Sequence, residues 1–313
     1  MKRKINPMIP LFIAVFSASF PPVIVQFTVM PSLSIAFFRL FFAAVILFPL
    51  VLARHRAELR ALPKKSLFFS ALGGCLFGAH FVTYFESLQH TTVASTSIIV
   101  GTETFFVTFI LFFYFRQPVS RRMLLGICVA FIGSVLIALC DNSVGSNLLY
   151  GDFLALISAI LFALYSMVTL RYRMEISVTL FTFIAYSAAS LFLLASCLGS
   201  GTALVGYRPL DYLLMLILTV FCTFLTHSIY AWVVGYLNAA FVASVRLLGP
   251  IFATIWAFWF FDQRPQPLAL MGGLIVLVGT RINIAAQNQT NRASEEKPPE
   301  TAVSSAPPSS DGR

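Results

Sequence analysis

The sequence predicts an all-α integral membrane protein, with about ten transmembrane helices arranged as two inverted repeats of five helices. Three observations predict this class. Hydrophobic residues make up 58% of the 313 residues and charged residues only 11%, whereas a water-soluble domain has about 25% charged residues. The apolar residues form runs of about 20, long enough to cross a bilayer. Short motifs in the first half also recur in the second.

The apolar runs give the expected helices in order. A window of about 20 residues places them at residues 8–30, 32–53, 66–87, 91–115, 121–140, 150–170, 176–198, 210–234, 239–261 and 267–286. The connections are often so short that consecutive helices must be antiparallel neighbours.

The first apolar run follows Lys2-Arg3-Lys4, as the apolar part of a signal peptide would. It is too long for a cleaved segment and leads directly into the second run, so we interpret it as a retained helix. Pro21-Pro22 should kink this helix. A kink that lines a cavity and a purely static kink are both consistent with the sequence.

The basic residues predict the orientation of these helices. With the N-terminus in the cytoplasm, seventeen Lys and Arg residues fall on the cytoplasmic side, and only Arg208 and Arg264 fall outside. This asymmetry follows the positive-inside rule and also supports the helix count, since one extra or missing span would destroy it. The net charge of +9 is therefore attributed to membrane topology, and we expect no nucleic-acid partner.

The apolar runs and the basic residues divide the chain into a cytoplasmic N-terminus at 1–7, a first repeat at 8–140, a second repeat at 150–286 and a tail at 287–313. We expect the tail to be disordered and cytoplasmic, because it is rich in Asn, Ser, Pro and Glu. The five cysteines form no close pair, so we interpret them as small apolar residues and expect no disulfide framework, metal site or cofactor.

The evidence for a repeat is a set of matched motifs. Residues 93–95 (VAS) recur at 242–244, and the glycines Gly126 and Gly133 are echoed by Gly272 and Gly279. A spacing of seven places both glycines of a pair on one helix face, where a neighbouring helix can approach closely. Repeats of five helices enter the membrane in opposite directions, which is a transporter architecture with its site near the midplane.

Ionisable residues inside the apolar runs are the candidates for that site. An arginine at depth in a bilayer costs about 3 kcal/mol or more, so it must face a partner or a water-filled cavity. Depth counting suggests that Glu103 pairs with Arg246, with Arg39 or with both, and that substrate or a proton competes for the pair. The alternative is a permanent pair that fixes helix packing. The candidates for binding substrate or a proton are Arg39, His80, Tyr84, Glu103, His227, Tyr230, Trp232 and Arg246.

The histidines and aromatic residues could have a structural role instead of a role in binding. His80 and His227 occupy near-mirror positions in their repeats and could bind substrate or titrate, but a hydrogen bond between helices would explain them as well. Tyr84, Tyr230 and Trp232 lie close to these histidines in sequence and could line a cavity. Most of the 33 Phe residues must face lipid or pack, so they indicate no aromatic substrate.

Three segments, at residues 31–40, 80–95 and 248–262, resemble the EamA-type proteins of the drug/metabolite transporter superfamily. Residues 31–40 (PSLSIAFFRL) resemble the second-helix motif of that family, and residues 80–95 (HFVTYFESLQHTTVAS) resemble the junction of its third and fourth helices. Residues 248–262, with Gly272, Gly273 and Gly279, are similar to the end of the second repeat. The resemblance covers about residues 8–286 and implies a ten-helix inner-membrane carrier, most often an exporter of amino acids or related metabolites.

The chain departs from the family pattern at several positions. The Glu-Pro pair that is frequent in the fourth and ninth helices appears as Glu103-Thr104 and as Gly249-Pro250. Arg116 replaces a frequent Glu, Asp262 keeps an acid at the matching point, and Arg246 is a charge that the family pattern does not contain. Substrates of relatives are therefore not transferred to this chain.

The sequence thus favours a secondary carrier that works by alternating access, exports a small metabolite such as an amino acid, and has the lipid bilayer as its surroundings. Proton coupling and a homodimer are left open, as are the substrate and the direction. A membrane-embedded enzyme and a non-transporting scaffold are the alternatives. We expect no enzyme, because the sequence contains neither a nucleophile elbow nor a metal-binding triad, and we expect no ATP-driven transport, because it contains no phosphate-binding loop. A channel is disfavoured by the lack of a filter-like loop.

Overall fold

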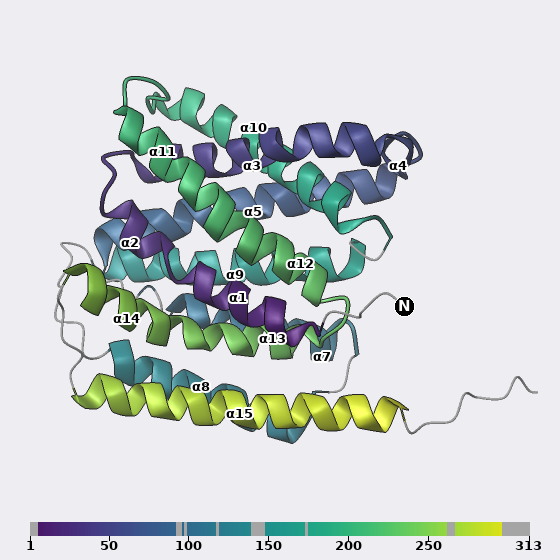
Figure 1. Cartoon of the computed structure of the whole chain (residues 1–313), viewed down its shortest axis with the longest axis vertical. Coiled ribbons are helices and arrows are strands. Elements are labelled where there is room, and N and C mark those ends of the chain that lie inside the picture. The colour runs from purple at the N-terminus through teal and green to yellow at the C-terminus, as the bar shows by residue number, and fades with distance from the viewer. Residues whose placement is uncertain are drawn as a thin grey trace, which may run out of the picture.

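A computed structural model describes residues 6–91, 96, 99–116, 119–138, 148–172, 175–261 and 267–295. Within these residues every regular element is a helix, and the chain contains no strand there (Figure 1). The first half contains α1 (Met8–Ala18), α2 (Pro21–Val25), α3 (Ser32–Arg54), α4 (Arg56–Arg60), α5 (Lys64–His90), α7 (Glu103–Phe113) and α8 (Arg121–Ala138). The second half contains α9 (Leu148–Tyr172), α10 (Val178–Ser200), α11 (Pro209–Ile217), η1 (Leu218–Ser228), α12 (Ile229–Val233), α13 (Ala239–Val245), η2 (Arg246–Leu248), α14 (Gly249–Phe261) and α15 (Pro267–Glu295).

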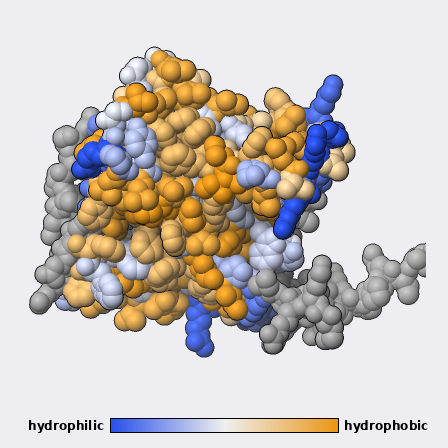
Figure 2. Space-filling model, turned by 45° about the horizontal axis from the view of Figure 1, so that its top comes forward, coloured by the Kyte–Doolittle hydropathy of each residue, from blue (hydrophilic) through white to orange (hydrophobic). Residues whose placement is uncertain are grey.

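The long helices lie side by side and suit a bilayer. In the described part, 6 helical segments are long and apolar enough to cross a membrane, and shorter apolar helices cover Ile99–Phe113, Ala239–Leu248 and Leu270–Ala286. Figure 2 shows a face that is mostly hydrophobic, with the strongly hydrophilic atoms mainly at its edges. Large apolar side chains such as Phe68, Phe113 and Trp259 are exposed on the outside of the bundle, as expected for residues that face lipid.

The first helix is broken, as Pro21-Pro22 predicts. Helix α1 ends at Ala18, and α2 starts with Pro21 at its first position, where a missing N–H costs nothing. The Ser19 hydroxyl lies in the break and donates to the Phe16 carbonyl at 2.7 Å. It also accepts a 2.7 Å hydrogen bond from the Trp256 indole of α14. The break is thus held by a helix from the other half of the chain.

The segment between α11 and α12 is a π-helix rather than an α-helix. It covers Leu218–Ser228, and the Thr223 hydroxyl donates to the Leu218 carbonyl five residues earlier at 3.4 Å. π-Helical turns are rare in proteins, and those that occur are often found at functional sites. The apolar pattern predicts a continuous α-helix here, so the wider winding is a feature that the sequence does not reveal.

The matched glycines pack two helices from different halves together. A Cβ on Gly279 of α15 would lie 2.4 Å from the Ala130 backbone nitrogen of α8, and one on Gly133 would lie 2.6 Å from the Gly272 carbonyl oxygen. Only hydrogen fits at these positions. The expected close approach at the glycine faces is therefore confirmed, with α8 and α15 as the two partners (Figure 1).

Helix α15 runs past residue 287, where the sequence predicts that a disordered cytoplasmic tail begins. Helix α15 continues to Glu295, and Arg122 of α8 donates to the Gln289 side chain at 2.8 Å. The segment 287–295 extends a helix already packed on α8, so it needs no apolar pattern of its own. Residues 296–313, the motif at 93–95 and Asp262 lie outside the described residues.

Polar contacts join helices at the end of the bundle where α3 and α10 meet the short helix α4. Ser177 caps the start of α10 and donates its hydroxyl to Glu58 of α4 at 2.7 Å. Burial raises the pKa of the Glu58 carboxyl, but hydrogen bonds from the Ser177 backbone and side chain outweigh this and hold the pKa below its usual value. Contacts of this kind connect the two halves away from the centre of the bundle.

Candidate functional site

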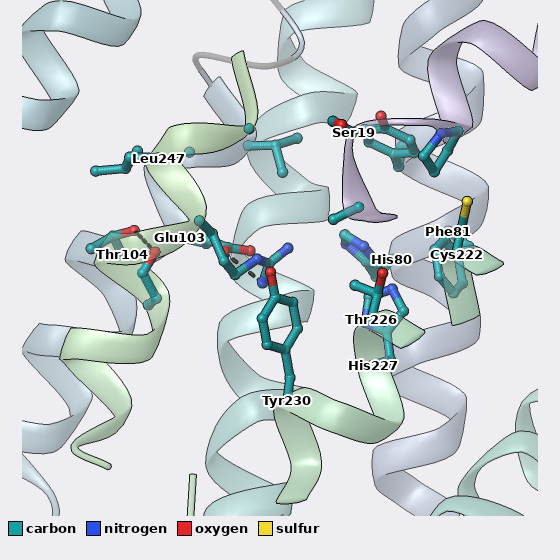
Figure 3. A pocket seen from close by; sticks show the side chains of 18 of the residues that line it. Ser19, His80, Phe81, Glu103, Thr104, Cys222, Thr226, His227, Tyr230 and Leu247 are labelled. Carbon is teal, nitrogen blue, oxygen red and sulfur yellow. Dashed lines mark hydrogen bonds and ion pairs between the residues drawn. The ribbon is translucent and has the colours of Figure 1, made fainter. Parts of the chain in front are cut away.

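A cavity of about 140 Å³ lies between the two halves of the chain, and it is large enough for several water molecules or a small metabolite. Helices from both halves contribute to its wall, among them α3, α5, α7, η1 and the η2 segment. Its described lining includes seven of the predicted candidates: Arg39, His80, Tyr84, Glu103, His227, Tyr230 and Arg246. Glu103 lies on one side of the space, while His80 and His227 lie on the other (Figure 3).

The buried carboxylate and one arginine form an ion pair. Arg246 Nη1 lies 2.6 Å from Glu103 Oε1, and the Glu103 residue is only 2% exposed. The other carboxylate oxygen, Oε2, is buried without a hydrogen-bond partner. The Arg246 guanidinium also stacks on Phe162, with Cζ 4.0 Å from the ring centroid. Of the two pairings left open by the sequence, the structure forms the one with Arg246.

Both members of this pair lie where a helix is interrupted. Glu103 begins α7 after a turn at Thr102, and a carboxylate is favourable at a helix N-terminus. Arg246 begins η2, a three-residue 3₁₀ segment between α13 and α14. A hydrogen bond of 3.2 Å from the Thr104 hydroxyl to the Ala243 carbonyl connects α7 with α13. These interruptions allow both charged side chains to project into the space between the helices.

Arg39 lies at a separate point of the lining and contacts no carboxylate in the described chain. Its Nε donates to the Thr223 hydroxyl at 2.8 Å, and its Nη2 donates to the Cys222 carbonyl at 2.7 Å. Its Cζ lies 4.3 Å from the centroid of the Phe81 ring. The residue is 1% exposed, so a full positive charge is buried among neutral groups.

The two histidines differ in their partners. His80 Nδ1 lies 2.9 Å from the Ser158 hydroxyl and 3.0 Å from the Ser158 carbonyl, so it joins α5 to α9. His227 Nδ1 is buried without a hydrogen-bond partner, and the ring stands edge-on to Phe77 at 4.6 Å. The hydrogen bond between helices that the sequence left open is therefore present for His80, whereas His227 keeps a free polar atom in the cavity wall.

Two of the three aromatic candidates line the cavity, and the third does not. Tyr84 and Tyr230 line the cavity, and the Tyr230 hydroxyl points toward its centre (Figure 3). The structure does not bring Trp232 to this site: the residue is half-buried, and its ring packs on Tyr236 with centroids 4.6 Å apart. The close sequence spacing to Tyr230 is misleading here, because residues two apart on a helix point in different directions.

Several wall residues were not predicted. Ser19, Phe81, Cys222 and Thr226 line the cavity, and Ser158 and Thr223 hold its basic and imidazole side chains. One signal could have found part of this set: Thr219, Thr223 and Thr226 recur at helical spacing in a strongly apolar stretch. Nothing in the sequence indicates Phe81, because it is one of many phenylalanines.

The cavity contains no metal-binding arrangement among the residues that the structure describes, where no three His, Cys, Asp or Glu side chains are grouped. Its chemistry is that of binding: guanidinium groups, one carboxylate, imidazoles and hydroxyls face a small space between helices. Such a set can hold a polar small molecule through charge and hydrogen bonds.

Comparison with known proteins identifies the family. The model of the EamA-like transporter family matches residues 6–139 and again residues 149–285. The chain belongs to this family. A curated protein of Archaeoglobus fulgidus, named only as an uncharacterized transporter, is 24% identical over 296 residues and covers 92% of this chain and 100% of its own length.

A solved structure shares the fold of this chain. A crystal structure described only as that of a protein superposes with a TM-score of 0.74 at 15% sequence identity, over 91% of this chain and 98% of the other. Together with the apolar helices, the family match makes this EamA-like chain a multi-pass membrane protein and a transporter of small molecules.

Proposed function

We propose that this EamA-like protein is a ten-span secondary transporter that exports a small metabolite, such as an amino acid or a related compound, by alternating access and in exchange for protons. The observation that carries the proposal is the Glu103–Arg246 pair at 2.6 Å, buried in the wall of the central cavity. An ion pair that must be broken and remade suits a site that is occupied in turn by substrate, by a proton or by neither.

The packing of the helices supports the inverted-repeat topology. Helix α5 packs on α9 and α10 of the other half, and at the equivalent positions η1 packs on α1 and α3. The pairs α3–α10, α7–α13 and α8–α15 each join equivalent helices of the two halves. A pseudo-two-fold axis in the membrane plane would produce this pattern, which supports two inverted repeats, 8–140 and 150–286, on either side of the cavity.

The distribution of basic residues supports an inner-membrane location with both termini in the cytoplasm. The end of the bundle formed by α4 and the start of α5 carries Arg54, Arg56, Arg60, Lys64 and Lys65, as the cytoplasmic side should. Binding sites of inverted-repeat transporters lie near the midplane of the bilayer, which is the depth proposed for this cavity.

The proposed coupling follows from the chemistry of the pair. A proton on Glu103 removes the negative charge and weakens the hold on Arg246, so protonation and substrate binding compete for the same groups. The partnerless Oε2 of Glu103 is the atom at which such a proton, or a polar group of the substrate, is accommodated. Whether the substrate also contacts His227 does not alter this coupling.

The test is efflux of a metabolite library from cells that express the wild type or Glu103→Gln, with and without a protonophore. Glu86→Gln is the matched control, because Glu86 pairs with His90 at 3.2 Å and does not line the cavity. We expect efflux that the protonophore abolishes and that falls at least about tenfold in Glu103→Gln at equal membrane levels. Efflux that changes neither with the protonophore nor with Glu103→Gln would refute the proton coupling. If no compound is exported at all, a membrane-embedded enzyme or a scaffold is favoured.

A further inference from the structure

The charges that line the cavity do not balance. Among its described lining residues, Arg39 and Arg246 are cations, Glu103 is the one carboxylate, and His80 and His227 are the imidazoles. Because Glu103 already pairs with Arg246, the charge of Arg39 remains without a counter-ion among the described residues. With neutral imidazoles the lining therefore has a formal charge of +1.

The surroundings of Arg39 hold the guanidinium without neutralising it. The Thr223 hydroxyl and the Cys222 carbonyl, both in the π-helix η1, accept from Nε and Nη2, which uses two of the five N–H donors. The Phe81 ring, 4.3 Å from Cζ, supports one face of the group. Moreover, the Thr219 hydroxyl donates to the backbone carbonyl of Arg39 at 3.0 Å, so α3 is fixed to η1 at this residue. The remaining N–H groups are held in place, ready for an acceptor.

A buried cation of this kind is costly, since a charge taken out of water needs an opposite charge or a full set of hydrogen bonds. A carboxylate is the natural partner, because it matches the planar guanidinium with two parallel hydrogen bonds. We propose that the cavity binds small organic acids of net charge −1, with the ionised carboxylate on Arg39. This inference rests on the proposed transport function and specifies its substrate class.

The cavity wall also offers places for a second polar group of the ligand. Glu103 Oε2 and His227 Nδ1 are buried without partners, in residues that are 2% and 6% exposed. Both residues line the same space, on opposite sides of it (Figure 3). A hydroxyl group can donate to one of these atoms and leave the net charge of the ligand at −1. The geometry thus favours a hydroxy acid over a simple fatty acid.

The experiment compares ligands that differ in charge and match in shape. Purified full-length protein is titrated with three triads: lactate, alanine and alaninamide; hydroxyisocaproate, leucine and leucinamide; phenyllactate, phenylalanine and phenylalaninamide. Dissociation constants are measured by calorimetry and thermal unfolding for the wild type, Arg39→Gln and Arg39→Lys. Arg122→Gln is the control, because Arg122 is exposed on α8 away from the cavity.

We expect the hydroxy acid of at least one triad to bind, its amino acid to bind about tenfold more weakly, and the amide not to bind. Arg39→Gln should weaken the acid about 10- to 100-fold, Arg39→Lys should weaken it less, and Arg122→Gln should leave it unchanged. A binding order led by the amino acids or amides would overturn the proposal, as would failure of every acid to bind.

A structural role for Arg39 gives a different result. If the residue only fixes α3 to η1, Arg39→Gln lowers the melting temperature of the free protein without changing the order of binding within a triad. That outcome would contradict the proposal. The library efflux test does not assume an acid as substrate, so efflux of neutral or cationic compounds would refute the substrate class and leave the transport function standing.

Discussion

At the scale of single residues, the cavity is defined by charges that are expensive to bury. Arg39, Glu103 and Arg246 all lie in apolar stretches, and two of the three neutralise each other. Removal of one member of a buried pair leaves the other as an uncompensated charge, which costs more than replacement of both. The pair is therefore better tested by a double-mutant cycle than by single variants.

We expect Glu103→Gln to destabilise the protein by about 3 kcal/mol, because Arg246 then keeps its charge without a carboxylate. The double variant Glu103→Gln/Arg246→Met should be destabilised by clearly less than the sum of the two single variants. Thermal or denaturant unfolding in detergent measures these differences. Strictly additive effects would show that the two side chains do not interact.

The sequence predicted these residues better than it predicted their contacts. An ionisable side chain in an apolar run is visible without a structure, and all but Trp232 of the chosen candidates line the cavity. What the sequence could not decide was the partner of Glu103, since depth counting placed Arg39 and Arg246 both within reach. That choice depends on the rotation of α3 and α7 about their axes, which the packing of neighbouring helices determines.

At the scale of elements, the polar wall of the cavity coincides with interruptions of helical winding. Ser19 lies in the break between α1 and α2, Glu103 follows the turn at Thr102, and Arg246 opens a 3₁₀ segment. The partners of Arg39 belong to a π-helix. Discontinuous helices expose backbone and side-chain polar groups where a straight helix would present only its apolar surface, and transporters use them to build binding sites.

These interruptions were only partly predictable. Pro21-Pro22 predicts the break between α1 and α2, because proline lacks the N–H that a helix interior requires. The π-helix at Leu218–Ser228 contains no proline, whereas the 3₁₀ segment at Arg246–Leu248 is followed by Pro250, which has no N–H to donate to the Arg246 carbonyl four residues earlier. For the π-helix the structure shows side-chain contacts across the bundle, such as Arg39 with Thr223, and these depend on how distant helices pack.

The glycine interface between α8 and α15 gives a prediction with an internal control. Gly279→Ala places a methyl group 2.4 Å from the Ala130 backbone nitrogen, so the helices must separate at a cost of about 1–3 kcal/mol. Gly273→Ala, on the same helix, meets its nearest atom only at 3.9 Å and should be neutral or stabilising by up to about 1 kcal/mol. Melting temperatures of the two variants check this. Equal effects would mean that α8 and α15 do not approach as closely as described.

At the scale of the whole molecule, the two family matches, at residues 6–139 and 149–285, correspond to two halves that meet around one cavity. Composition and apolar runs were enough to predict a helical membrane protein, and the resemblance of residues 31–40, 80–95 and 248–262 to EamA-type proteins indicated the family. The cavity itself requires the three-dimensional arrangement, because its wall combines residues as distant in sequence as Ser19 and Gly249. The proposed alternating access belongs to this scale, since it would need both halves to move.

The most direct measurement of the central claim is the accessibility of the cavity from each side of the membrane. Val100 lines the cavity and is half-buried, so Val100→Cys, in a variant whose five natural cysteines are replaced, reports access to it. Phe112→Cys is the control, because Phe112 of α7 is exposed on the outside of the bundle, where lipid lies.

We predict that a membrane-impermeant maleimide labels Val100→Cys both in intact cells and in inverted vesicles. A transported compound or a change of pH should shift labelling from one side of the membrane to the other. Phe112→Cys should stay unlabelled. Labelling of Val100→Cys from one side only, under every condition, would contradict alternating access through this cavity.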